Sequence, residues 1–89
     1  ARGTTDLLEL ESAALDPTDA AALAAAPPEI ARRATRRWLR TTNPDHHPPD
    51  RATVERVLAV ARVEQRATDV GGGWRVERTR GRLRLTPPV

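Results

Sequence analysis

The strongest constraint on the fold is a change of hydrophobic periodicity at the three-glycine run, residues 71–73. Before this run, apolar residues recur every three or four positions, which is typical of amphipathic helices. After it, "WRVERT" and "RLRLT" alternate apolar and polar residues, which is typical of half-buried strands. Arg80-Gly81 separates the two stretches and predicts a two-residue hairpin loop. The sequence therefore predicts an α+β fold, in which three helices are followed by an antiparallel β-hairpin.

The hairpin loop also fixes which residues face each other across the two strands. Val76 is expected opposite Leu85, and Glu77 opposite Arg84, so that one face is apolar and the other carries an ion pair. The expected buried face consists of Trp74, Val76, Leu83 and Leu85. The stretch "ATDV" before the glycine run can add a third strand, which would make a three-stranded sheet.

Three helices are predicted, at residues 17–26, 28–42 and 50–65. Asp16 is expected to cap the first helix with Pro17 at its first position, and Asp50 is expected to cap the third. At about 100° per residue, the second helix gathers an apolar half. Its members are Ile30, Ala31, Ala34, Trp38 and Leu39. The third helix directs Val54, Val57, Leu58 and Ala61 inward.

A chain of 89 residues corresponds to one domain with a thin core. Residues 1–14 are expected to be a linker or interdomain segment, and residues 15–89 the small α+β domain. No apolar run approaches the roughly 18–20 residues that span a bilayer, so no membrane association is expected. The absence of cysteine suits a reducing compartment, and a cytoplasmic location is expected.

Arginine is distributed unevenly along the chain. Residues 1–31 hold one Arg against six acidic residues, whereas residues 32–89 hold fourteen Arg against six. All fifteen basic residues are Arg, which codon bias in a GC-rich genome explains, and which also suits bidentate phosphate binding. This asymmetry predicts a basic lobe for an anionic partner.

The predicted helix at 28–42 carries five arginines on the half opposite its apolar residues: Arg32, Arg33, Arg36, Arg37 and Arg40. Like charges four residues apart destabilise a helix by a few tenths of a kcal/mol per pair, and on this helix only Glu29, which can reach Arg33, offsets them. Two interpretations stay open: contact with phosphate groups, or solvation with carboxylate partners inside the protein. Further basic contacts are expected from the hairpin, at Arg75, Arg80, Arg82 and Arg84.

No catalytic or metal site is predicted. The glycine run precedes a strand rather than a helix, so it is expected to form a turn and not a phosphate-binding loop. No Ser/His/Asp or Cys/His arrangement supports a nucleophile. Asp45, His46, His47 and Asp50 carry ligand types that suit zinc or nickel, but adjacent histidines in an extended loop point apart. We expect a solvated loop there, able at most to take up an adventitious ion.

A winged helix, which binds DNA, has the same order of elements. In that motif a short turn leads into a recognition helix rich in base-reading side chains. Here residues 43–49 form a seven-residue connection with three prolines, and the third predicted helix shows mainly Val, Ala and Leu. The arginines lie on the preceding helix instead, which disfavours the DNA-binding alternative.

Three stretches, "PPEIARRATRRWLR", "RATVERVLAVARV" and "GGGWRVERTRGRLRL", point to a family. They resemble the domain that follows the catalytic domain of bacterial tRNA(Ile)-lysidine synthetase. The family's helix ends in Arg-x-Trp-Leu, matched by Arg36-Arg37-Trp38-Leu39, and its hairpin in a Gly-x-Leu-x-Leu-like stretch, matched by residues 81–85. The resemblance covers about residues 15–86.

The resemblance implies a role in an enzyme that uses ATP and magnesium to attach lysine to the wobble cytidine of an isoleucine tRNA. In the family, the chemistry belongs to a preceding PP-loop domain with a Ser-Gly-Gly-x-Asp-Ser motif, which this chain lacks. The chain is therefore expected to be non-catalytic and to hold no cofactor itself. Its expected partners are tRNA and the PP-loop domain. The alternative is a structural module, in which the acidic first third docks on a neighbouring domain or on another copy.

Overall fold

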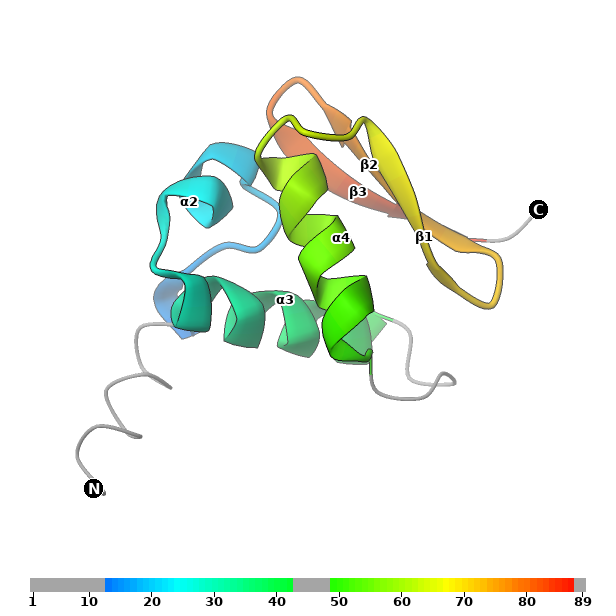
Figure 1. Cartoon of the computed structure of the whole chain (residues 1–89), viewed down its shortest axis with the longest axis horizontal. Helices are drawn as coiled ribbons and strands as arrows, with labels where there is room; N and C mark the ends of the chain where they lie inside the picture. The colour runs from blue at the N-terminus through cyan, green and yellow to red at the C-terminus, as the bar shows by residue number, and fades with distance from the viewer. Residues whose placement is uncertain (1–12, 43–48, 88–89) are drawn as a thin grey trace.

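The computed structural model describes residues 13–42 and 49–87. Three helices precede a three-stranded antiparallel sheet, so the predicted α+β class is confirmed (Figure 1). The helices are α2 (Ala20–Ala25), α3 (Pro28–Thr42) and α4 (Arg51–Ala61), and the strands are β1 (Ala67–Gly71), β2 (Trp74–Thr79) and β3 (Arg82–Thr86). Of the expected linker at residues 1–14, all but the last two residues lie outside the described part.

Helix α4 is the centre of the molecule. It packs against β1 and β2 on one side and against α2 and α3 on the other. Six of its eleven residues are buried, among them Val54, Val57, Leu58 and Ala61, as the sequence predicted. They meet Leu23 from α2, and Val76 and Leu83 from the sheet, in one core. Helix α3 lies across the end of α4 that is remote from the β2–β3 turn (Figure 1).

The predicted start of the first helix is wrong. The cap of α2 is Asp19, whose side chain accepts a hydrogen bond from the Ala22 amide at 3.1 Å. Asp16 instead closes a local turn, accepting from the Thr18 amide at 2.9 Å and from its hydroxyl at 2.7 Å. Because Asp16 is used in this turn, Pro17 lies outside the helix. In contrast, the Asp50 cap of α4 is confirmed, with a 2.8 Å bond from the Thr53 amide.

The predicted end of the third helix is also wrong, because α4 stops at Ala61 rather than near residue 65. Val63 adopts a left-handed conformation, with φ of 67°. Its amide bonds to the Val60 carbonyl at 3.2 Å, and the Glu64 amide bonds to the Ala59 carbonyl at 2.9 Å. This pair of bonds is the Schellman arrangement that terminates helices, here with valine at the position that glycine usually occupies.

The sheet confirms the predicted register. Val76 pairs with Leu85 and Glu77 with Arg84, and β1 is the third strand that "ATDV" suggested. Val76 and Leu83 are buried, whereas Trp74 and Leu85 are half-buried. Arg80 and Gly81 both have positive φ, 52° and 77°, as a type I′ hairpin turn requires. The three glycines at 71–73 also have positive φ and turn the chain from β1 into β2.

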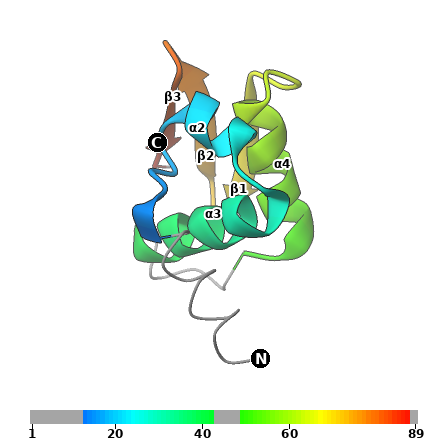
Figure 2. The same cartoon turned by 90° about the vertical axis from the view of Figure 1, so that its left-hand side faces the viewer.

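The free side of β3 meets the segment that leads into α2. The Leu83 amide donates to the Thr18 carbonyl at 2.7 Å, and the Ala20 amide donates to the Gly81 carbonyl at 2.9 Å. Figure 2 shows α2 beside β3, and the two views together place this contact at the end of the molecule away from α3. The start of the domain is thereby tied to its C-terminal hairpin.

Candidate functional site

Helix α3 presents its arginines on the side away from the core. Its buried residues are Ile30, Ala31, Ala34, Thr35 and Leu39. At about 100° per residue, Arg33, Arg36 and Arg40 lie around the middle of the opposite face. Arg32 lies at the edge of that face nearer α4, and Arg37 lies at the other edge. Trp38 was expected in the core and is half-buried against it.

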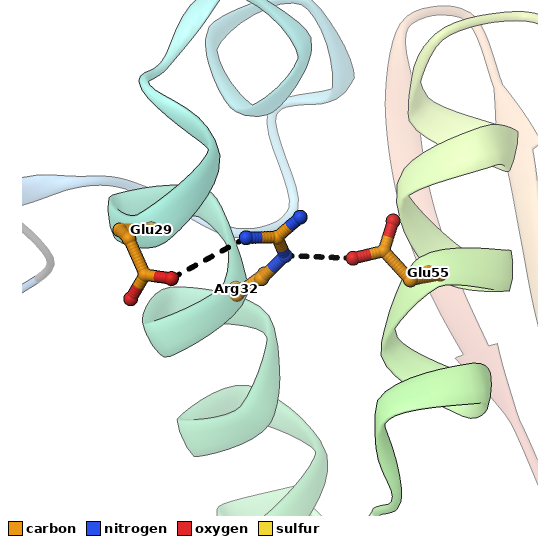
Figure 3. Close-up of polar contacts among 3 residues, drawn as sticks. All are labelled: Glu29, Arg32 and Glu55. Atoms are coloured by element: carbon orange, nitrogen blue, oxygen red, sulfur yellow. Dashed lines mark hydrogen bonds and ion pairs between the residues drawn. The ribbon is translucent and has the colours of Figure 1, made fainter.

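Arg32 joins α3 to α4 through Glu55 and also contacts Glu29 on its own helix. Its Nε lies 2.7 Å from Oε1 of Glu55 on α4, and its Nη1 lies 3.3 Å from Oε1 of Glu29 (Figure 3). The hydrogen bond from Arg32 lowers the pKa of the Glu55 carboxyl below its ordinary value, and the same bond raises the pKa of the guanidinium. The sequence had assigned Glu29 to Arg33, but here it contacts Arg32. The arrangement makes Arg32 a structural residue that ties α3 to α4.

An open pocket of about 310 Å³ lies beside this ion pair, between α3 and the start of α4. We call it the α3 pocket; its lining residues are Glu29, Arg32, Arg33, Arg36 and Arg51. Four guanidinium groups therefore surround it with a single carboxylate. Such a cluster can receive an anion, because each guanidinium offers several donors in a planar fork.

Arg51 is the lining residue that the sequence did not point to. It is the first residue of α4, directly after the Asp50 cap. Its place beside Arg36 depends on how α3 and α4 cross, and no local pattern reports that crossing. Arg37 and Arg40, in contrast, are exposed on α3 but do not line this pocket.

The hairpin arginines are arranged differently from those on α3. Nε of Arg75 lies 3.5 Å from Oε1 of Glu77 on the same strand, and Nη1 of Arg82 lies 3.4 Å from Oδ2 of Asp16. Arg84 pairs across the strands with Glu77 in the register, and Arg80 occupies the turn. Carboxylates thus accompany part of this set, and the four arginines do not form one cluster with the α3 pocket.

Neither a metal cluster nor a membrane helix occurs in the part of the chain that the structure describes. Within residues 13–42 and 49–87, no three His, Asp or Glu side chains gather as metal ligands would. Asp45, His46 and His47 lie outside the described residues. Over the same two ranges, no helix has both the length and the apolar character that crossing a bilayer requires.

A comparison with models of known protein families gives a match to this chain. The model of the TilS substrate binding domain matches residues 19–84. The chain belongs to this family. The TilS match runs from the cap of α2 into β3, so it includes the arginine face of α3 and the α3 pocket, and it confirms the resemblance to tRNA(Ile)-lysidine synthetase. No curated protein and no solved structure matches the chain.

Proposed function

We propose that this chain is the tRNA-positioning domain of a tRNA(Ile)-lysidine synthetase and that the outer face of α3 contacts tRNA phosphates. The observation that carries the proposal is the α3 pocket, in which four arginines from two helices converge around one acid. The substrate-binding family to which the chain belongs supports the same reading.

The geometry gives these arginines different roles. Arg36, Arg40 and Arg51 are the contact residues, because they lie on the outer face of α3 or at the start of α4. Arg33 and Arg37 flank them. Arg32 is a positioning residue, since its guanidinium is engaged by Glu29 and Glu55. Contacts of this kind read the shape of the RNA backbone and leave base identity to other parts of the enzyme.

The chemistry is assigned to another domain of the same enzyme. A preceding PP-loop domain would bind ATP, magnesium and lysine and would form the adenylated tRNA intermediate. The present domain would hold the tRNA so that the wobble cytidine reaches that site. The ligase would act in the cytoplasm, where tRNA is modified.

The DNA-binding alternative has less support from the geometry. In a winged helix, the helix before the hairpin enters the major groove. Here α4 occupies that position, and six of its eleven residues are buried in the core. The second alternative, a docking module without RNA contact, is separated from the proposal by the following experiment.

The test replaces Arg36 and Arg40 by glutamine in the full-length protein. Arg33 is left in place, so that the variant changes only two arginines, one helical turn apart on the outer face of α3. The R36Q/R40Q variant should bind tRNA several-fold more weakly, to a similar extent for cognate and non-cognate species. The slope of log affinity against log salt should become shallower by about 0.7–0.9 for each lost phosphate contact.

A matched control carries the same loss of charge elsewhere. Arg56 on α4 and Arg62, the residue that follows α4, are exposed and do not line the α3 pocket. The R56Q/R62Q variant should therefore change affinity and salt slope much less. Equal effects of the two double variants, or unchanged binding by R36Q/R40Q with a lowered melting temperature, would refute the proposed contact.

A further inference from the structure

A second group of arginines converges at the other end of α4. An open pocket of about 360 Å³ lies there, beside the β2–β3 turn. We call it the hairpin pocket; its lining residues are Arg66, Ala67, Arg75, Glu77, Arg78, Thr79 and Arg80. As in the α3 pocket, four arginines and one acidic residue form the lining. The sequence pointed to Arg75 and Arg80 but not to Arg66 or Arg78.

The pocket is built by the fold rather than by a run of basic sequence. Arg66 directly precedes β1, Arg78 lies near the end of β2, and Arg80 lies in the turn after it. The Arg78 amide donates to the Arg66 carbonyl at 3.3 Å, which holds the start of β1 against the end of β2. Three separate segments thus bring their charges to one place.

The positive charge of the hairpin pocket exceeds what the domain itself balances. Glu77 is engaged by Arg75, at 3.5 Å between Oε1 and Nε. Four arginines against one carboxylate leave a net positive charge at the pocket, which a bound anion would balance.

The conformation of Arg80 points the same way. Its φ of 52° is one that Asn or Gly adopts readily and that other residues adopt at a cost. For the stability of the turn, Asn-Gly would therefore serve better than Arg80-Gly81. Side chains held in such conformations cluster at functional sites. Compared with asparagine at this position, Arg80 adds a guanidinium group at the rim of the basic pocket.

The two pockets are too far apart to hold a single phosphate. Arg51 opens α4 and Arg66 lies beyond its end, and the helix of eleven residues spans about 16 Å at 1.5 Å per residue. Figure 1 shows the start of α4 at one end of the molecule and the β2–β3 turn at the other. This distance exceeds the screening length of about 8–10 Å at physiological salt, so the two charge clusters act independently.

We infer that the hairpin pocket is a second seat for an RNA backbone phosphate, so that the domain holds one tRNA at two separated points. The inference rests on the proposed function, because the same RNA must reach both pockets. It adds Arg66 and Arg80, which are both exposed, as contact residues. It also implies that the domain fixes the direction of the RNA as well as its presence, since two contacts define a line.

The test uses Arg80→Asn and Arg66→Gln in the full-length protein with a tRNA transcript as the probe. R80N should melt at the same or a higher temperature than the parent, because asparagine suits the turn, yet it should bind tRNA more weakly. R66Q leaves the turn unchanged, so it should melt at the same temperature as the parent and should also bind tRNA more weakly. Between 50 and 200 mM salt, each lost contact should reduce the fall in affinity by about threefold. R62Q, which removes a nearby exposed charge outside the pocket, is the control.

Combination with the α3 variant separates this inference from the proposed function. If both seats bind one RNA independently, the fold-losses of R66Q/R80N and R36Q/R40Q should multiply in the quadruple variant. If R66Q and R80N lose no more tRNA affinity than R62Q, the second seat is overturned and the α3 contact stands. The same holds if the quadruple variant binds tRNA no more weakly than R36Q/R40Q. Full binding by the quadruple variant would overturn both.

Discussion

At the scale of single residues, Val63 is a β-branched residue in a left-handed backbone conformation, which such residues rarely adopt. It has φ of 67° and is 65% exposed. A left-handed conformation costs an L-residue about 1–2 kcal/mol, and glycine avoids this cost while losing about 0.5–1 kcal/mol of chain entropy. Val63→Gly should therefore stabilise the domain by up to about 1 kcal/mol, measured by urea unfolding.

The buried neighbour Val60 provides the contrast for this prediction. Val60 is fully buried inside α4, so Val60→Gly removes core packing and adds a helix-breaking residue. It should destabilise the domain strongly. A lower melting temperature for V63G as well would mean that the exposed valine makes contacts that outweigh its backbone cost.

At the scale of elements, the ion pair between α3 and α4 makes stability depend on pH. The hydrogen bond from Arg32 lowers the pKa of Glu55 from its ordinary value of 4.5, so folding favours the charged carboxylate. This contribution is fully present above that value and is lost as the pH falls through the lowered pKa of the folded state. Hydrogen bonds from Thr53 and Thr18 lower the pKa of Asp50 and Asp16 from 3.8 in the same direction.

The Glu55→Gln variant isolates the contribution of Glu55 to the loss of stability at low pH. At neutral pH the variant should melt at a lower temperature than the parent, because Arg32 loses its closest charged partner. As the pH falls below 4.5 and through the lowered pKa of Glu55 in the folded state, the two melting temperatures should converge, since the parent carboxylate becomes protonated. Melting curves recorded across this range test the prediction. A difference that stays constant with pH would show that the pair contributes through shape alone.

At the scale of the whole molecule, the proposed division of labour predicts that these 89 residues are catalytically silent. The chain offers arginine pockets but no motif for binding pyrophosphate. Purified on its own, it should neither bind ATP measurably nor release pyrophosphate when given lysine and tRNA. The full-length protein, assayed in parallel, is the positive control. Turnover by the purified chain would place the chemistry within it and contradict the proposed function.

The sequence predicted the sheet better than the helix ends, for physical reasons. A two-residue loop and strict alternation leave one register in which Val76 and Leu85 are both on the inner face. Helix ends depend on competing local signals. Asp16 and Asp19 can both cap a helix. At the end of α4, Val63 occupies the position where a glycine would have indicated the helix end.

The candidate site was predictable as a helix face but not as a pocket. The spacing of the arginines on α3 follows from the helical repeat alone. Which of them would be neutralised depended on Glu55, which lies 23 residues further along the chain than Arg32. The same applies to Arg51 and Arg66, whose positions beside other arginines result from helix crossing and strand pairing. Contacts between distant segments leave no local periodicity to read.

The bonds from Leu83 to Thr18 and from Ala20 to Gly81 have a consequence for how the domain avoids self-association. An outer strand with unpaired amides and carbonyls is a template on which another chain can add its own strand. Here the residues just ahead of α2 occupy part of that template. A fragment trimmed to the family boundary at Asp19 would lose the Thr18 carbonyl and leave the Leu83 amide open to a neighbour. The short segment before α2 therefore covers part of this strand edge, and the unit with its edge covered is longer than the unit that defines the family.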